Sequence, residues 1–211
     1  MSILRVIDLR GGGDLDTLIG PRRETDLSEA ENVARGIVEA VRRHGDDALV
    51  EFTRRFDCPS FDAGDIRVQD DEVEAAYQAV DEGWLDAVRT ATANVEAFHR
   101  RHVNDSWVES FGNLRLGVRI TPLEVVGLYG PAGRAPLPSS VLMSAIPARV
   151  AGVSRLILCT PPRADGTAVP TMLVAAAEAG VTDAFKVGGA QAIAALAYGT
   201  ETVPKCDKVV G

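Results

Sequence analysis

Residues 125–140 read Val125-Val-Gly-Leu-Tyr-Gly-Pro-Ala-Gly-Arg-Ala-Pro-Leu-Pro-Ser-Ser140, and an apolar run over 141–151 follows them. The first five residues have the composition of a short buried strand, and the Gly and Pro residues after them predict a loop. Ser139 and Ser140 are of the residue type that favours a helix N-cap. The stretch therefore predicts a strand, a loop and a helix start, which is the arrangement of many nucleotide sites.

The same alternation continues to the end of the chain. Short apolar segments predict strands at 125–129, 155–159, 183–187 and 207–210, with helices between them at 139–151, 168–179 and 190–198. Gly152 and Gly180 are placed to end two of these helices. Strands that alternate with helices at a spacing of roughly 25 to 30 residues indicate a parallel sheet with right-handed crossovers. Residues 122–211 are thus predicted to form an incomplete Rossmann-like parallel sheet, truncated at its C-terminal end.

The chain before residue 122 is predicted to be mainly helical, so the fold class is α/β. Residues 1–25 form an N-terminal arm with a short strand at 4–9 and a flexible turn at Arg10-Gly-Gly-Gly13, and 26–121 form a helical segment. Within that segment the pattern predicts helices that run from Asp26 or Ser28 to Gly45, over 46–56, from Asp70 onward and over 82–103. It also predicts a strand at 66–68 and a hairpin of 107–111 with 114–120. The apolar stripe of the long helix, which ends at Phe98, is predicted to face inward.

Composition excludes several classes of protein. The chain has 211 residues, 46% of them apolar, and a formal net charge of −8, so a nucleic-acid partner is not expected. The apolar runs are too short for a membrane span, and the first residues lack a secretory pattern, which predicts a cytoplasmic protein. Cys58, Cys159 and Cys206 are odd in number and far apart, which favours reduced, structural thiols.

Two groups of polar residues resemble metal sites but have simpler interpretations. The cluster Asp70-Asp71-Glu72 is predicted to be a helix cap, because acidic side chains complement the positive helix N-terminus. His99 and His102 could share one helix face and bind a metal, yet basic residues are also common at helix C-termini. No catalytic residue and no metal ligand is assigned in this chain.

Two loops are candidates for a ligand. Residues 130–138 form a long connection stiffened by three prolines, and Gly188-Gly189 allows close backbone approach, with Gln191 in the first turn of the next helix. Neither loop has the G-x-G-x-x-G spacing of dinucleotide sites. Gly188-Gly189 could equally serve close packing of helix on sheet, and Tyr129 could stack on an aromatic ligand or cover the core.

The residues of the second half resemble histidinol dehydrogenase. The resemblance is carried by Val126-Gly-Leu-Tyr129, Arg134-Ala-Pro-Leu-Pro-Ser-Ser-Val-Leu-Met143, Ala145-Ile-Pro-Ala-Arg-Val-Ala-Gly152, Cys159-Thr-Pro-Pro162 and Lys186-Val-Gly-Gly-Ala-Gln-Ala-Ile-Ala-Ala-Leu-Ala-Tyr-Gly-Thr200. It covers most of 122–211. The helical part before it, including Phe98-His99, is similar to the family more loosely.

This resemblance implies an NAD-dependent, zinc-requiring homodimer that oxidises L-histidinol to L-histidine in histidine biosynthesis. It implies that Tyr129 and Gln191 contact NAD. The catalytic residues and zinc ligands belong to the second half of the family's chain, as does the Asn that follows the motif begun at Lys208-Val-Val-Gly211. The resemblance therefore makes this chain the NAD-binding N-terminal half, inactive alone.

The chain also departs from the family's pattern. Gly130-Pro-Ala-Gly133 stands where the family has Val-Pro-Gly-Gly, and Ser144 stands in place of Asn. Because Ala132 has a Cβ, it disfavours a positive φ, so an altered loop is expected. Two alternatives remain open at this point: a naturally short, non-catalytic nucleotide-binding or interaction module, and a related amino-alcohol dehydrogenase.

Overall fold

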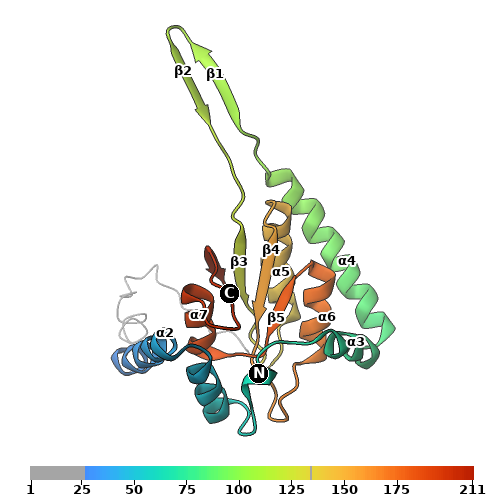
Figure 1. Ribbon diagram of the computed structural model, residues 1–211. Helices are drawn as coiled ribbons and strands as arrows, with labels where there is room; N and C mark the ends of the chain where they lie inside the picture. The colour runs from blue at the N-terminus through green and yellow to red at the C-terminus, as the bar shows by residue number, and fades with distance from the viewer. Residues whose placement is uncertain (1–26, 134) are drawn as a thin grey trace, which may run out of the picture. The chain divides into compact units, whose positions relative to one another are not determined.

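The computed structural model describes residues 27–133 and 135–211 (Figure 1). The predicted arm, with its strand at 4–9 and its turn at 10–13, lies outside the described residues. The helices are α2 (Ser28–Phe56), α3 (Asp70–Ala79), α4 (Glu82–His99), α5 (Pro138–Val150), α6 (Pro170–Ala179) and α7 (Gly189–Tyr198), with short 3-10 helices η1 (Ala63–Asp65) and η2 (Arg100–His102). The strands are β1 (Trp107–Phe111), β2 (Leu114–Val118), β3 (Val125–Tyr129), β4 (Arg155–Cys159), β5 (Asp183–Phe185) and β6 (Lys208–Val210). None of the described helices has the length and apolar character that a bilayer span requires.

The predicted parallel sheet is confirmed. Its strand order is β5-β4-β3-β6, and all three ladders are parallel. The predicted strand at 66–68 lies antiparallel along the outer side of β5, where the Val68 N–H donates to the Ala184 carbonyl (2.9 Å) and the Lys186 N–H to the Ile66 carbonyl (2.7 Å). In the described part of the chain, β6 therefore forms the other edge of the sheet.

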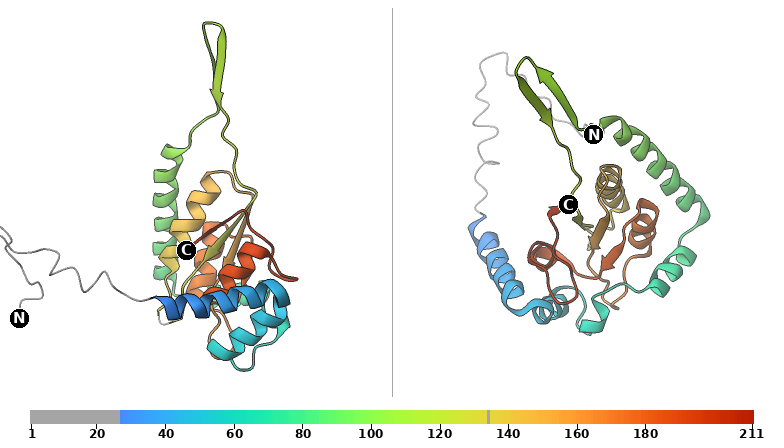
Figure 2. Two further views of the ribbon diagram at one scale, coloured as in Figure 1. Left: turned by 90° about the vertical axis from the view of Figure 1, so that its left-hand side faces the viewer. Right: turned by 45° about the horizontal axis from the view of Figure 1, so that its top comes forward.

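Side-chain alternation divides the core between the two faces of the sheet. Because successive strand residues point to opposite faces, Leu128 and Leu158 pack in one cluster with α5 and α6, whereas Ile157 belongs to the other cluster. That second cluster includes buried residues of 37–52 in α2 and of α7. Figure 2 shows α5 and α6 on one side of the sheet, α4 outside them, and α7 on the other side. The sheet is thus covered on both faces, as parallel sheets require.

A break at Gly45 divides α2 in two, as the sequence predicts. Gly45 has φ 50° and ψ −128°, which a residue with a side chain rarely adopts. The N–H of Asp46 donates to Oε2 of Glu201 (2.9 Å), and a Cβ on Gly45 would lie 2.3 Å from that oxygen. The second half of α2 therefore starts with a cap from the far end of the chain.

Two details of the sequence prediction were wrong. The N-cap of α5 is Leu137, and Pro138 occupies the first helical position, so Ser139 and Ser140 lie inside the first turn. Proline suits this position because its φ is already helical and it has no N–H to satisfy. Phe98 does not face the core: it is 61% exposed and packs instead on the rings of its neighbours, with its centroid 4.6 Å from that of His102.

Glycine ends two helices as predicted. Gly180 (φ 86°) follows α6 and Gly152 (φ 89°) follows α5, both in the left-handed region.

All three cysteines are buried and unpaired, as expected, and burial raises the pKa of the Cys206 thiol to about 11. Burial also raises the pKa of the Cys159 thiol, so Cys159 and Cys206 are protonated and unreactive at neutral pH.

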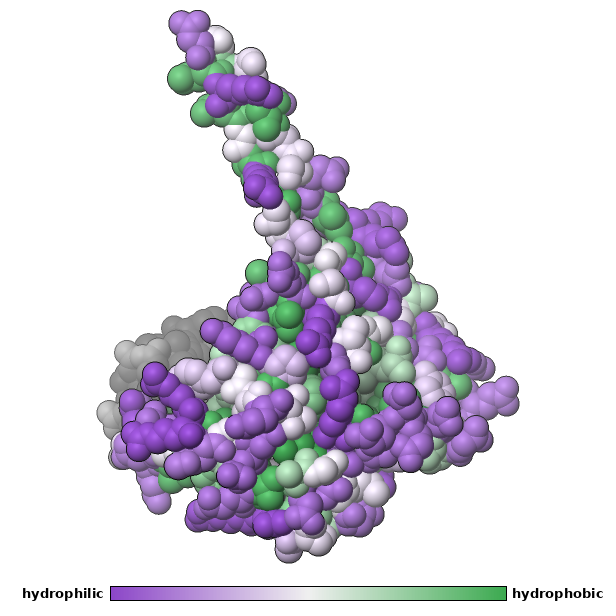
Figure 3. All heavy atoms as spheres, in the orientation of Figure 1, coloured by the Kyte–Doolittle hydropathy of each residue, from purple (hydrophilic) through white to green (hydrophobic). Residues whose placement is uncertain are grey.

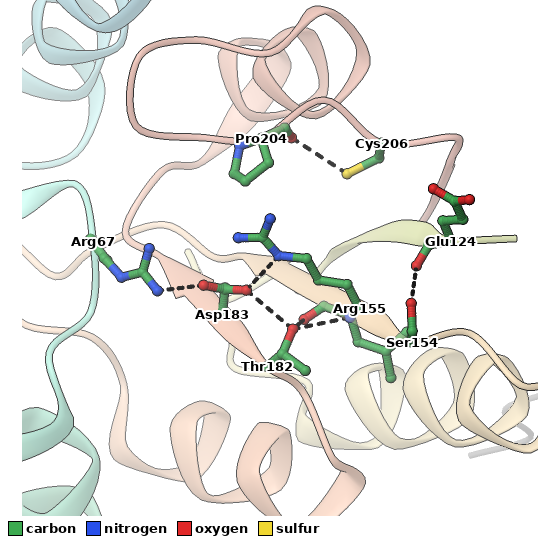
Figure 4. Close-up of polar contacts among 9 residues, drawn as sticks. Arg67, Glu124, Ser154, Arg155, Thr182, Asp183, Pro204 and Cys206 are labelled. Carbon is green, nitrogen blue, oxygen red and sulfur yellow. Dashed lines mark hydrogen bonds and ion pairs between the residues drawn. The ribbon is translucent and has the colours of Figure 1, made fainter.

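A charged network ties the 66–68 segment to the sheet (Figure 4). Arg155 Nε donates to Asp183 Oδ2 (2.9 Å), the hydroxyl of Thr182 donates to the same oxygen (3.2 Å), and Arg67 forms an ion pair with Oδ1. The Asp183 side chain is only 8% exposed. Burial alone would raise the pKa of this carboxyl, but the hydrogen bond and charge of Arg155, with Thr182 and Arg67, hold it below its ordinary value of 3.8.

We expect Asp183→Asn to lower the free energy of unfolding by about 1 to 2 kcal/mol, because it removes the charge of a buried carboxyl that accepts from two half-exposed arginines. The matched control is Glu39→Gln. Glu39 also pairs with two arginines, Arg42 and Arg43, but on an exposed helix surface, and its loss should cost less than about 1 kcal/mol. Urea unfolding of the purified chain measures both values.

The pH dependence of the same measurement tests the cause. Since the folded-state pKa of Asp183 is lowered, its contribution is fully present above the ordinary value of 3.8 and is lost as the pH falls through the lower folded-state value. The free energy of unfolding of Asp183→Asn should accordingly fall less between about pH 5 and about pH 2 than that of the unsubstituted chain. Equal acid sensitivity of the two proteins would contradict this account of the network.

Candidate functional site

The carboxyl ends of three strands lie level at one edge of the sheet. Tyr129 of β3 is the ladder partner of Cys159 of β4, which is in turn the partner of Phe185 of β5. The loops that follow these strands therefore leave the sheet side by side, and ligands of open parallel sheets bind at this edge.

The structure brings the two predicted loops together through Tyr129. The backbone N–H of Gly189, the first residue of α7, donates to the hydroxyl oxygen of Tyr129 (3.1 Å). Gly189 has φ 58°, so the turn into α7 uses a conformation that favours glycine. Tyr129 is half-buried and packs against the α2 and α7 side of the core. Its ring both covers the core and ends at the ligand edge, so the two sequence interpretations of Tyr129 do not exclude each other.

Gln191 has an unusual environment for a polar side chain. It is 1% exposed, and within the described structure its amide Nε2 has no hydrogen-bond partner. A buried amide without a partner costs about 1 to 3 kcal/mol, and such groups are uncommon in folded proteins. Its Oε1 lies close to the backbone of Gly189, 2.8 Å from where a Cβ would stand. The free donor therefore lies in the first turn of α7, beside the loop that Tyr129 contacts.

Helix α7 has no cap from its own N-cap residue, and the Tyr129 hydroxyl accepts from its first N–H. Gly188 is the N-cap residue, and it has no side chain to accept from the first-turn N–H groups. A helix N-terminus of this kind attracts anionic groups such as a pyrophosphate. Gly188 also packs closely, since a Cβ there would lie 2.6 Å from Cβ of Pro161. The glycine pair thus serves close packing as well as exposing the backbone.

The loop after β3 departs from the family's pattern at Gly130 and Ala132. Its backbone conformation at Ala132 is nevertheless ordinary. Among the described residues only glycines have a positive φ, so Ala132 is not strained, and its side chain is buried in the core. Gly130 is tightly enclosed: a Cβ would lie 2.8 Å from Cε of Met172 and 3.0 Å from Cδ1 of Leu158. The larger neighbours occupy the space that a side chain at 130 would need.

Sequence reasoning missed two polar residues at this edge. Lys186 is 5% exposed, and its Nζ donates to Oε1 of Glu72 (2.7 Å), while the other Glu72 oxygen accepts from the N–H of Gln69 (3.0 Å). Glu72 is therefore the cap that the sequence predicts and also the partner of a buried lysine. Thr160, directly after β4, is fully buried with no partner for its hydroxyl in the described structure. A lysine between Phe185 and Val187, in an apolar run, was the available signal for the ion pair.

Residues 27–133 and 135–211 contain no group of three or more His, Cys, Asp or Glu side chains arranged to hold a metal ion. His99 and His102 lie near each other, with ring centroids 5.8 Å apart, and Nδ1 of His102 lies 3.2 Å from the Phe98 carbonyl oxygen. The described residues therefore do not fit a zinc site, and no chemical step through zinc is derived from them.

Comparison with known proteins supports the resemblance. A family model described as histidinol dehydrogenase matches residues 20–211. Histidinol dehydrogenase of a Synechococcus strain is 49% identical over 200 residues, which cover 94% of this chain and 46% of that protein. The enzyme of Thermosynechococcus vestitus is 46% identical over 211 residues, covering 99% of this chain and 48% of that protein.

A solved structure agrees with the fold. The crystal structure of histidinol dehydrogenase from Elizabethkingia anophelis superposes with a TM-score of 0.80 at 36% identity, over 89% of this chain and 42% of that one. The chain spans about half the length of the curated relatives it matches, and corresponds to their N-terminal half. On these matches, the chain belongs to the histidinol dehydrogenase family.

Proposed function

We propose that this chain is the NAD-binding half of an enzyme that oxidises L-histidinol to L-histidine, the last steps of histidine biosynthesis. Membership of the family and the half-length match support this proposal. The observation that carries the cofactor assignment is the buried amide of Gln191, whose Nε2 lacks a partner at the carboxyl edge of the sheet. A buried N–H donor without a partner lowers the stability of the fold. A ligand that accepts its hydrogen bond explains why such a donor is present.

The residues at this edge fit a dinucleotide. Tyr129 offers an aromatic ring, Gln191 offers an amide donor, and the start of α7, whose N-cap glycine has no side chain, offers a positive dipole end to a pyrophosphate. NAD, when bound, supplies the hydride acceptor. The part of this chain is then to hold and orient the cofactor: Tyr129 fixes the turn at Gly189, and that turn sets the direction of the first N–H groups of α7.

The remaining parts of the proposal concern the other half of the family's chain. It would supply the catalytic residues, the zinc ligands and most contacts to histidinol, and the active enzyme would be a cytoplasmic homodimer without nucleic-acid or membrane partners. The chain on its own would then bind NAD but would not oxidise histidinol.

Activity measurements test this division of labour. The 211-residue protein with L-histidinol, NAD⁺ and Zn²⁺ should form no NADH. Co-expressed with the second half of the Synechococcus relative as a separate polypeptide, it should form NADH, measured by the absorbance of the reduced nicotinamide, and a chelator should abolish the signal. NADH formation by the chain alone would refute the proposal. NAD binding without activity in the combined sample would favour the non-catalytic module instead.

Substitution of Tyr129 tests the cofactor contact. We expect Tyr129→Ala to weaken NAD binding about fivefold, since an aromatic contact contributes about 1 kcal/mol beyond area burial. Isothermal titration of the 211-residue protein with NAD⁺ measures the affinity. Tyr198→Ala is the control, because Tyr198 lies at the opposite end of α7 and is half exposed. Unchanged affinity in Tyr129→Ala would leave this residue a role in the core alone.

Substitution of Gln191 gives a sharper test, because stability and affinity should change in opposite directions. Gln191→Met has nearly the same shape but no amide, so it removes the unpaired donor. We expect the free energy of unfolding without NAD to stay equal or rise by about 1 kcal/mol, while NAD binds about tenfold more weakly. Urea unfolding and titration calorimetry measure the two quantities. A variant that loses stability and keeps its NAD affinity would show that Gln191 is a structural residue.

A further inference from the structure

The loop that joins β5 to α7 begins with a buried cation. Lys186 directly follows β5, and its side chain is 6% exposed. Its Nζ donates to Oε1 of Glu72 (2.7 Å), and the other Glu72 oxygen accepts from the backbone N–H of Gln69, the N-cap residue of α3. One charge-assisted contact therefore connects the start of α3 to the start of this loop.

The stability of the fold is a weak explanation for this ion pair. Removing an ammonium group from water is costly, and the attraction of a carboxylate often does no more than repay that cost. Lys186 bears most of it, because the Glu72 side chain is 24% exposed. Figure 3 shows mostly polar side chains where α3 reaches the surface, so Glu72 would stay hydrated without the lysine. An apolar residue at 186 should then fold about as well, and the charge needs another reason.

The loop itself supplies that reason, because it is short and contains glycine. It has three residues, Lys186, Val187 and Gly188, and the turn into α7 continues through Gly189. Glycine has more backbone freedom than any other residue, so neighbouring groups must hold such a turn. From the β3 side, the hydroxyl of Tyr129 accepts from the Gly189 N–H (3.1 Å). From the α3 side, the turn is held by the contact between Lys186 and Glu72.

We propose that Lys186 and Glu72 are positioning residues for the cofactor. Their ion pair holds the turn at Gly188-Gly189 in the conformation in which Gln191 and the first N–H groups of α7 meet NAD. The inference rests on the proposed function, in that it takes NAD as the ligand of this edge.

The burial of Gln191 makes its direction depend on the turn. Gln191 follows Lys186 by five positions and is 1% exposed, so its amide cannot turn toward a ligand independently of the backbone that carries it. A molecule in which the turn has moved no longer offers this amide in the right place. The apparent affinity then falls in proportion to the fraction of molecules that keep the turn.

Lys186→Met tests the proposal, because methionine fills much of the same space without a charge. Its midpoint of urea unfolding should stay close to that of the unsubstituted chain. If about one molecule in five keeps the turn, NAD⁺ should bind about fivefold more weakly in isothermal titration of the 211-residue protein. Without NAD⁺, the Gly189 amide should exchange its hydrogen at least about fivefold faster, as measured by NMR.

Two further variants test whether the charge is the cause. Lys186→Arg should restore the affinity and the slow exchange of Gly189, since it returns the cation, and a polar cavity of about 370 Å³ beside Lys186 has room for a guanidinium. Glu72→Gln removes the charge at the other end of the pair, while its amide oxygen can still accept from the N–H of Gln69. It should change both quantities in the same direction as Lys186→Met.

Arg149→Met is the matched control. Arg149 of α5 also forms a partly buried ion pair, with Glu96 of α4 (2.8 Å), and it donates to the carbonyl oxygen of Ala179 (3.0 Å). These contacts lie between helices that do not carry the loop. Arg149→Met should therefore lower the stability of the chain and leave both the NAD⁺ affinity and the exchange of Gly189 unchanged.

The proposal is overturned if Lys186→Met loses stability but keeps the affinity and the slow exchange, because the pair would then serve the fold alone. It is also overturned if all three quantities stay unchanged, or if Lys186→Arg behaves like Lys186→Met. If Lys186→Met does not fold, the same two readouts of Glu72→Gln decide.

Failure of the proposed function would have a different signature, since the unsubstituted chain would then bind no NAD⁺. Exchange at Gly189 would still decide the role of the pair. Faster exchange in Lys186→Met would support its hold on the turn, and equal exchange in the two proteins would overturn it.

Discussion

Strand β3 pairs with β4 on one side and with β6 on the other, and these two ladders position the other elements around the sheet. Its ladder with β4 aligns Tyr129 with Cys159, and its ladder with β6 brings the last strand to the sheet. Gly127, in the middle of β3, has no room for a side chain, because a Cβ would lie 2.9 Å from Sγ of Cys206 and from Cδ2 of Leu196. The close approach of α7 to β3 that this glycine permits is what places Gly189 within hydrogen-bond distance of the Tyr129 hydroxyl.

The order and type of the elements could be predicted from the sequence because they depend on local patterns. Apolar blocks at strand length, Gly152 and Gly180 at helix ends, and the Gly112-Asn113 turn each act within a few residues, and the structure has all of them. Errors arose where a local preference had a competitor. Ser139 and Ser140 favour an N-cap, but Pro138 fits the first helical position better. Phe98 continues an apolar stripe, yet it lies in the last turn of α4, where neighbouring histidine rings pack on it.

The candidate site was predictable in part. Tyr129 and Gln191 could be selected because a strand end and a Gly-Gly helix start have local signatures, but their meeting through Gly189 depends on how α7 packs on β3. The Lys186–Glu72 pair joins residues 114 positions apart, and the unpaired amide of Gln191 is a property of its three-dimensional surroundings. A lysine in an apolar run indicates that Lys186 needs a partner, but no pattern in the chain identifies Glu72 as that partner or reveals the unpaired amide. The polar chemistry of the site is therefore the part that requires the folded structure.

The cap at the break in α2 has a consequence for how the chain folds. The backbone N–H of Asp46 donates to Glu201, while the Asp46 carboxylate accepts from the Thr202 hydroxyl, and the first of these contacts spans 155 positions in the sequence. On the ribosome the start of this half of α2 is made 155 residues before Glu201, so it stays without its cap until Glu201 and Thr202 have emerged. Contacts of such long sequence separation slow folding, because the loop between them must close before the contact forms. The second half of α2 is thus made early in the described part of the chain but completes its contacts late.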